Sequence, residues 1–164
     1  MVVYIGNDHG GYALKRILVE RIKEMKIEYV DVGSDSEQIV RYPYFAAKVA
    51  AAVAEKKADR GILICSTGIG MSIMANRFKG VRAALCTDPY MAKMTRRHND
   101  SNLLCLGGKI TGELEALDIM ETWLNSTYEG GRHNISLGLI AEAEQGLCRD
   151  GLPEYEILFS DAAK

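Results

Sequence analysis

The feature that most constrains the fold is a set of five short apolar runs, of which residues 61–65 form the clearest. This run reads Gly-Ile-Leu-Ile-Cys and contains no polar residue. A β-strand without polar alternation is usually buried on both faces, as in a parallel sheet that helices cover on both sides. The five predicted strands cover residues 2–6, 29–32, 61–65, 83–86 and 103–106.

Longer amphipathic stretches separate these strands. Residues 13–26 carry apolar side chains at helical spacing, with lysine and glutamate on the opposite side. The other predicted helices cover residues 43–55, 70–78, 89–98, 112–124 and 135–145. This alternation favours right-handed βαβ units, so we expect an α/β fold with a parallel sheet between two helical layers. We expect one domain over residues 1–146, followed by an extension over 147–164 that packs on a neighbour or stays loose.

Composition excludes several classes of protein. A chain of 164 residues suits one domain, and its net charge of −2 favours neither nucleic acid nor an anionic membrane as partner. No apolar run approaches the roughly 20 residues that span a bilayer, and the first residues do not resemble a signal peptide. The chain has four well-separated cysteines and no C-x-x-C pair, which predicts reduced thiols and a cytoplasmic protein.

The loop that follows residues 61–65 predicts an anion-binding turn. It reads Cys65-Ser66-Thr67-Gly68-Ile69-Gly70 and leads from a buried strand into a helix. Its two glycines let backbone N–H groups point at one spot, where they stabilise a phosphate or an enediolate oxygen. Such a turn also favours a thiolate, so Cys65 is a candidate base or nucleophile. The alternative is a buried cysteine before a tight turn, and the motif alone leaves both open.

Other motifs are weaker alone. Asp8 and His9 follow the first strand, so they share the carboxyl edge of the sheet with Cys65. His98 and Asn99 end a helix, where a purely structural cap is equally plausible. Arg132 follows a Gly-Gly pair that also suits a solvated loop. The cysteines at 86 and 105 lie inside apolar strands without such a turn, and we interpret them as structural.

Taken in order, seven motifs resemble the ribose-5-phosphate isomerase B family, which includes the galactose-6-phosphate isomerase subunits. The resemblance extends over residues 2–145. The motifs are Asp8-His9-Gly10-Gly11, Tyr42-Pro43, Ile64-Cys65-Ser66-Thr67-Gly68-Ile69-Gly70, Ala75-Asn76, Gly80-Val81-Arg82-Ala83, His98-Asn99-Asp100 and Tyr128-Glu129-Gly130-Gly131-Arg132-His133.

This resemblance implies a Rossmann-like αβα sandwich and a homodimer, or a dimer of dimers, with active sites shared between subunits. It implies aldose–ketose interconversion of a sugar phosphate through a cis-enediolate, with no metal and no other cofactor. By position, Cys65 would be the base, Thr67 with the amides of Gly68 and Gly70 would hold the enediolate oxygen, and Asp8 and His98 would assist ring opening. The remaining substrate contacts would come from His9, Tyr42, Ser66, Asn99, Lys109 and Arg132.

Four positions bear on the identity of the substrate and the base. Lysine stands at 109 where the ribose enzymes usually carry arginine, Ser136 replaces a second arginine, and Arg41 replaces a small or acidic residue. Some relatives carry a glutamate base at position 71, where this chain has Met71.

From the resemblance, the default substrate is ribose 5-phosphate, with ribulose 5-phosphate as product. Allose 6-phosphate, galactose 6-phosphate and a tetrulose phosphate are alternatives with the same chemistry. A non-catalytic sugar-phosphate-binding subunit is a further alternative. A flavodoxin-like nucleotide-binding domain is disfavoured, because no acidic residue follows at the spacing that binds ribose.

Overall fold

The computed structural model describes residues 1–145, so the predicted extension at 147–164 lies outside the described residues. Five parallel strands form one sheet in the order β2-β1-β3-β5-β4. The strands are β1 (Val2–Asn7), β2 (Glu28–Asp31), β3 (Arg60–Cys65), β4 (Ala83–Leu85) and β5 (Leu103–Gly107). Each one overlaps a predicted strand, which confirms the parallel α/β fold.

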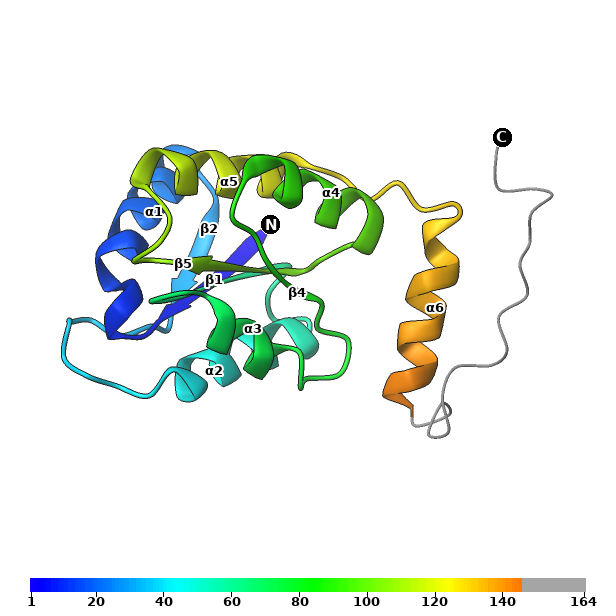
Figure 1. Ribbon diagram of the computed structural model, residues 1–164, viewed down its shortest axis with the longest axis horizontal. Coiled ribbons are helices and arrows are strands. Elements are labelled where there is room, and N and C mark those ends of the chain that lie inside the picture. Colours follow the sequence, from blue (N-terminus) through cyan, green and yellow to red (C-terminus); the bar gives the residue numbers. More distant parts are fainter. Residues whose placement is uncertain (146–164) are drawn as a thin grey trace.

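The described residues form six α-helices and one short 3-10 helix, of which α5 and α6 follow the last strand and the others connect strands. The α-helices are α1 (Tyr12–Glu24), α2 (Tyr42–Ala54), α3 (Ile69–Ala75), α4 (Pro89–Asn99), α5 (Glu113–Asn125) and α6 (His133–Glu144), and the 3-10 helix is His9–Gly11. Helices α1, α4 and α5 cover one face of the sheet, and α2 and α3 cover the other (Figure 1). The third predicted helix ends earlier than expected, at Ala75 rather than residue 78.

The uniformly apolar strand β3 supplies both halves of the core. Ile62 and Ile64 pack with α1, α4 and α5, whereas Leu63 and Cys65 pack with α2 and α3. Alternate side chains of a strand point to opposite faces, so a strand covered on both sides needs apolar residues throughout. The sulfur of Cys65 therefore lies on the α2–α3 side, at the carboxyl end of the central strand.

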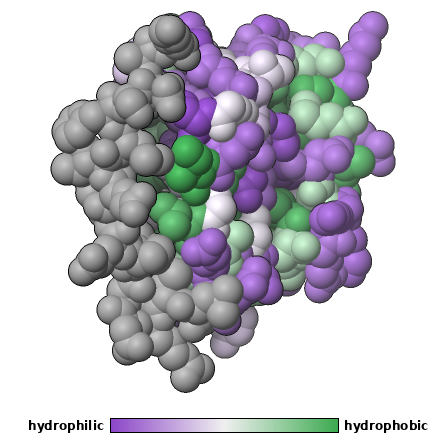
Figure 2. Space-filling view, turned by 90° about the vertical axis from the view of Figure 1, so that its right-hand side faces the viewer, coloured by the Kyte–Doolittle hydropathy of each residue, from purple (hydrophilic) through white to green (hydrophobic). Residues whose placement is uncertain are grey.

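Helix α6 lies at the side of the fold, beside α4 (Figure 1), and Glu144 at its end accepts the N–H of Gly80 at 3.0 Å. None of its residues is buried, and Ile135 is 65% exposed. Figure 2 views the molecule from the side on which α6 lies. On this face, hydrophobic residues lie among hydrophilic ones. Within residues 1–145, no helix is long and apolar enough to cross a membrane.

Candidate active site

Three loops meet at the carboxyl edge of the sheet, as the sequence predicted. The N–H of Asp8 donates to the carbonyl of Ile64 at 3.1 Å, which ties the loop after β1 to the end of β3. The N–H of Gly108 donates to the carbonyl of Cys65 at 2.7 Å, which ties the loop after β5 to the same point. Because both bonds are to main-chain atoms, they fix the loops around Cys65 whatever side chains the loops carry.

Cys65 lies at the centre of this edge with its sulfur inside the glycine turn. The Sγ atom accepts the N–H of Gly68 at 3.1 Å, and the residue is 6% exposed. Gly68 has φ +76°, in the left-handed region, which turns its N–H back toward the sulfur. The N–H of Ile69 bonds to Thr67 Oγ1 at 3.4 Å. The hydrogen bond from Gly68 N–H holds the sulfur in a fixed position against the backbone of the glycine turn.

The other two described cysteines are unsuited to proton transfer. Burial raises the pKa of Cys86 to about 12. It raises the pKa of Cys105, which is fully buried in β5, well above the usual value. A general base works best with a pKa near the working pH. The structure thus agrees with the prediction that these two cysteines are structural.

Asp8 and His9 line a cleft beside Cys65. Asp8 is 6% exposed, and its Oδ1 accepts the N–H of Gly10 at 2.8 Å, so the carboxylate also caps the 3-10 helix. His9 Nδ1 accepts the N–H of Val40 at 3.3 Å, so a neutral imidazole carries its proton on Nε2. The cleft has a volume of about 560 Å³ and is lined by Asp8, His9 and residues 39–44.

The Tyr42 ring and the Ser66 hydroxyl each pack directly against a glycine of the active-site loops. A Cβ on Gly70 would lie 2.9 Å from Cζ of the Tyr42 ring, so the ring packs directly on this glycine. A Cβ on Gly10 would lie 2.2 Å from Ser66 Oγ. The glycines at these positions therefore let side chains approach the backbone of the two loops. The N–H of Lys109 bonds to the carbonyl of Ser66 at 3.1 Å, which places Lys109 at the rim.

Within one chain, His98 lies at the amino ends of the strands, opposite the carboxyl ends where Cys65 lies. Helix α4 begins at the carboxyl edge, where Asp88 caps it, and then runs back along the sheet to end at residue 99. Three residues after the end of α4, the carbonyl of Asn102 accepts the N–H of Gly61. This bond places the end of α4 near the start of β3. The four steps from Gly61 to Cys65 span about 13 Å. One chain therefore does not bring His98 to Cys65.

Asn99 and Arg132 accompany His98 at this amino edge. The carbonyl of Asn99 accepts a hydrogen bond from Arg82 Nε at 3.0 Å, just before β4. Arg132 is the exposed N-cap residue of α6. The loop that leads to it is tied to α4, since the N–H of Glu129 donates to the carbonyl of Arg97 at 3.0 Å. The predicted site residues thus form two groups, one at each edge of the sheet.

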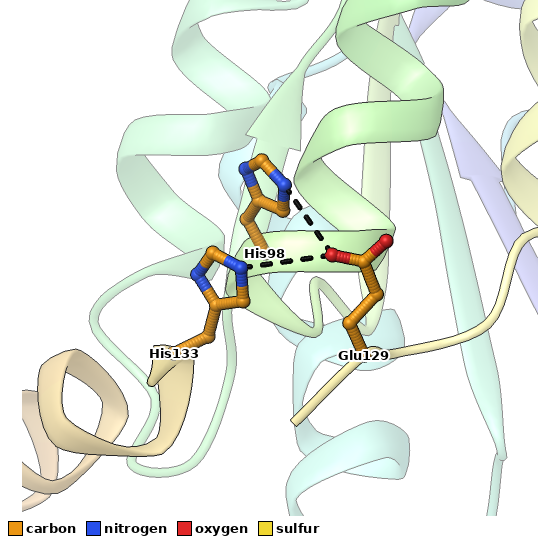
Figure 3. A group of neighbouring side chains, drawn as sticks. All are labelled: His98, Glu129 and His133. Carbon is orange, nitrogen blue, oxygen red and sulfur yellow. Dashed lines mark ion pairs between the residues drawn. The ribbon is translucent and has the colours of Figure 1, made fainter. Parts of the chain in front are cut away.

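The structure adds Glu129 and His133, which the sequence analysis placed in the motif at 128–133 without assigning them a role. Arg97 donates to Glu129 Oε1 and holds the pKa of that carboxyl below its usual value. Glu129 Oε2 lies 3.6 Å from His98 Nε2 and 3.7 Å from His133 Nε2 (Figure 3). The two imidazole rings stack, with centroids 4.2 Å apart. The motifs at 98–100 and 128–133 contain all three residues, but nothing in the sequence indicated that the two motifs meet.

A network around Asp100 fixes the end of α4. Asp100 Oδ1 accepts from Arg96 Nη1 at 2.8 Å, and Oδ2 accepts from Arg82 Nη2 at 2.9 Å. Arg96 is almost fully buried and also donates to the carbonyl of Ser101. Asp100 itself has φ +45°, which is unusual for a residue other than glycine. These bonds fix the backbone just after α4.

Two of the substituted positions have a clear structural setting. Met71 is fully buried on α3, so it belongs to the core rather than to the cleft. Ser136 is exposed on α6, four residues after Arg132. A cavity of about 620 Å³ lies between α1 and the segment after β2, and none of the predicted site residues lines it.

Comparison with known proteins gives close matches. The family model described as Ribose/Galactose Isomerase matches residues 3–140. Ribose-5-phosphate isomerase B of Escherichia coli (strain K12) is 43% identical over 143 residues, which cover 87% of this chain and 96% of that protein. Ribose-5-P isomerase B of Listeria innocua is 43% identical over 145 residues, with 88% and 98% covered.

Solved structures are similar over almost their whole length. Ribose-5-phosphate isomerase B of Clostridium thermocellum has a TM-score of 0.88 and 48% identity, covering 90% of this chain and 99% of that one. The Mycoplasma genitalium enzyme with bound ribulose-5-phosphate has a TM-score of 0.85 and 36% identity, covering 88% and 96%. These similarities confirm the predicted Rossmann-like sandwich.

Proposed function

The chain belongs to the Ribose/Galactose Isomerase family, and from this membership we propose that it interconverts ribose 5-phosphate and ribulose 5-phosphate. It is an aldose–ketose isomerase. Relatives from Escherichia coli and Clostridium thermocellum bear the name ribose-5-phosphate isomerase B, and the Mycoplasma genitalium relative was solved with the ketose product bound. The single observation that carries the proposal is the position of Cys65 within the glycine turn, where three loops meet.

Cys65 is the base of the proposed reaction. Its thiolate takes the proton from C2 of the open-chain aldose, and the electron pair of that C–H bond forms the C1–C2 double bond of a cis-enediolate. The carbonyl electrons of C1 move onto O1 in this step, and a proton then passes from O2 to O1. As the C2–O2 double bond forms, the same thiol returns its proton to C1, which gives the ketose and restores the thiolate. A single base suffices because both carbons present the same face to it. The hydrogen bond from Gly68 N–H supports this role by holding the sulfur in one position beside the glycine turn.

The glycine turn holds the enediolate oxygen. Thr67 Oγ1 and the amides of Gly68 and Gly70 provide the hydrogen-bond donors around it, with the Gly68 N–H shared between this oxygen and Cys65 Sγ. Gly70 lies in the first turn of α3, where N–H groups have no carbonyl partner within the helix. Fixed backbone dipoles stabilise a developing negative oxygen without any need to reorient during the reaction.

Two protein chains complete each proposed site in a homodimer. Asp8, His9 and Lys109 lie at the carboxyl edge beside Cys65, whereas His98 and Arg132 lie at the amino edge. Ring opening requires Asp8 and His98 to act on one sugar, and Asn99 binds one of its hydroxyl groups. His9, Lys109 and Arg132 neutralise the phosphate. The separation of the two edges supports a site that takes Cys65 from one chain and His98 from its partner.

A second candidate keeps this chemistry and changes the sugar. Lys109 offers the phosphate a single point charge in place of the bidentate fork of arginine, and Ser136 offers no charge. A longer sugar, such as allose 6-phosphate or galactose 6-phosphate, would place its phosphate farther from Cys65. The chain would then hold it with a different set of cations.

A coupled assay over a panel of sugar phosphates tests the substrate. We expect turnover of ribose 5-phosphate to exceed that of the six-carbon and four-carbon compounds, and no detectable turnover of ribose 5-phosphate would refute the default. Cys65→Ala should abolish turnover and retain substrate binding, and unchanged turnover would remove Cys65 from the mechanism. Lack of turnover with every sugar, together with tight binding of one, would favour the non-catalytic subunit.

A mixing experiment tests the shared site. Cys65→Ala and His98→Ala should each be inactive alone. If the two variants are unfolded together and refolded at equal amounts, half of the dimers contain one chain of each kind. Each such dimer has one site with both mutations and one site with neither, so about a quarter of the sites regain full activity. Absence of any recovery, with mixed dimers demonstrated by mass, would contradict the shared site.

A further inference from the structure

Three metal-ligating side chains converge at the amino edge of the sheet. They come from separate parts of the chain: His98 from the end of α4, Glu129 from the loop after α5, and His133 from the start of α6 (Figure 3). One nitrogen or oxygen from each lies within 4.8 Å of the other two. Both imidazoles direct Nε2 toward the same carboxylate oxygen, Glu129 Oε2.

Arg97 fixes the orientation of the Glu129 carboxylate. Arg97 binds Oε1, so Oε2 faces the two histidines. The backbone bond from Glu129 N–H to the carbonyl of Arg97 anchors the loop that carries the carboxylate. Arg97 thus orients the carboxylate without occupying the oxygen that faces the imidazoles.

We propose that His98, Glu129 and His133 bind a Zn²⁺ ion through two imidazole nitrogens and one carboxylate oxygen. Two histidines and one carboxylate are a common zinc ligand set, and water takes the fourth position. Tetrahedral coordination at bonds of about 2.0–2.1 Å requires the three ligand atoms to approach to about 3.3 Å. The stacked rings must tilt apart to point at one ion. All three side chains are partly exposed, which leaves room for this movement.

The chemistry of the ligands determines which ion fits. Imidazole nitrogen favours zinc and neighbouring transition metals, whereas Mg²⁺ and Ca²⁺ require oxygen ligands. The positive charges of Arg97 and Arg132 near the cluster oppose any cation, so an ion held only by charge would not bind here. An ion that forms direct bonds to two imidazoles can offset this repulsion.

A bound Zn²⁺ would also inhibit the isomerase, a consequence that rests on the proposed function. The ion occupies Nε2 of His98, the imidazole assigned to ring opening. The site would therefore make turnover of the cyclic substrate sensitive to zinc at concentrations at which Mg²⁺ has no effect.

Isothermal titration of the full chain with ZnCl₂ tests the site, with all variants matched by circular dichroism and Tm. We expect one ion per chain for the wild type, and an affinity at least tenfold weaker for His133→Ala and for Glu129→Gln. His9→Ala removes the histidine outside the cluster and Glu115→Gln removes an exposed carboxylate of α5, so both should bind as the wild type does. Unchanged affinity in His133→Ala would overturn the proposal.

Two further measurements distinguish this site from zinc bound elsewhere on the chain. Cys65→Ala should keep its zinc affinity, and a loss there would overturn the proposal by placing the ion on the thiol. Titration with Co²⁺ should give the visible absorption of a four-coordinate ion, and His133→Ala should lack it. Because these readouts need no turnover, an inactive chain that binds zinc would refute the proposed function alone. An active chain that does not bind zinc would refute the site alone.

Discussion

Gly68 is the position in the candidate active-site turn that leaves least room for a side chain. A Cβ there would lie 2.6 Å from Leu85 Cδ1 and 2.9 Å and 3.0 Å from the carbonyl carbon and oxygen of Leu106. The leucine side chain can move aside, but the carbonyl belongs to the backbone of β5 and cannot. We therefore expect Gly68→Ala to push the turn that holds Cys65 away from the sheet.

The expected loss of folding stability in Gly68→Ala has two parts. An alanine at φ +76° costs about 1–2 kcal/mol, because an L-residue is strained in the left-handed region. The clash with packed backbone adds about 1–3 kcal/mol, typical of overpacking. The sum, about 2–5 kcal/mol, is a large share of the ~5–15 kcal/mol by which domains are usually stable. Gly80 provides the matched control, since it has φ +77° and nothing within 4 Å of a Cβ. Gly80→Ala should show the first part only.

Urea unfolding of both variants at one protein concentration measures the two free energies of unfolding. We expect Gly68→Ala to be less stable than Gly80→Ala by about 1–3 kcal/mol. The isomerase rate should fall in Gly68→Ala and stay near that of the wild type in Gly80→Ala. Equal losses of stability in the two variants would refute the role of the backbone contact, because only the left-handed φ would then matter.

Three further predictions concern single side chains. Burial raises the pKa of the Cys105 thiol, so iodoacetamide should not alkylate it in the native protein and should do so after unfolding; peptide mass spectrometry that finds native labelling would contradict its buried position. The hydrogen bond from Arg21 lowers the folded-state pKa of Glu121, so this pair stabilises the protein above the unfolded carboxyl pKa of about 4.3 and stops doing so as the pH falls through the lowered value. Glu121→Gln should then lower Tm slightly at neutral pH and not in acid, and an equal shift at both would refute the linkage. Asp100→Ala removes the carboxylate partner of the buried Arg96, which keeps only the carbonyl of Ser101. We expect a loss of about 1–3 kcal/mol from this and about 1–2 kcal/mol from the left-handed φ. Asp100→Asn tolerates that φ and keeps an acceptor oxygen, so it should lose less by urea unfolding, and equal losses in the two variants would contradict both contributions.

The strands were predictable because burial on both faces leaves a pattern that needs no tertiary information. The apolar run at 61–65 matches β3 within one residue, and the glycine turn after it lies at the predicted edge. Loops that leave parallel strands must share one edge, so Asp8 and Cys65 could be placed together from the order of elements alone.

The position of His98 could not be read from motif order. A crossover helix that starts at the carboxyl edge returns to the amino edge, and the 11 residues of α4 cover about 16 Å of that distance. The motif at 98–100 is therefore carried away from the motif at 65–70 by the fold itself. Glu129 and His133 were missed for another reason, since their partner His98 is about 30 residues away in sequence and no local pattern links them.

Because α6 packs only lightly on its own chain, the rate of amide hydrogen exchange in this helix should report whether a second chain binds to it. Amide hydrogens exchange with solvent when their hydrogen bonds open, and the local cost of opening depends on the packing of the element. The amides of β3, between β1 and β5, should exchange only through global unfolding. Those of α6, which buries no residue within its own chain, should exchange far faster in dilute protein. If a second chain covers this helix, its exchange must slow as the protein concentration rises.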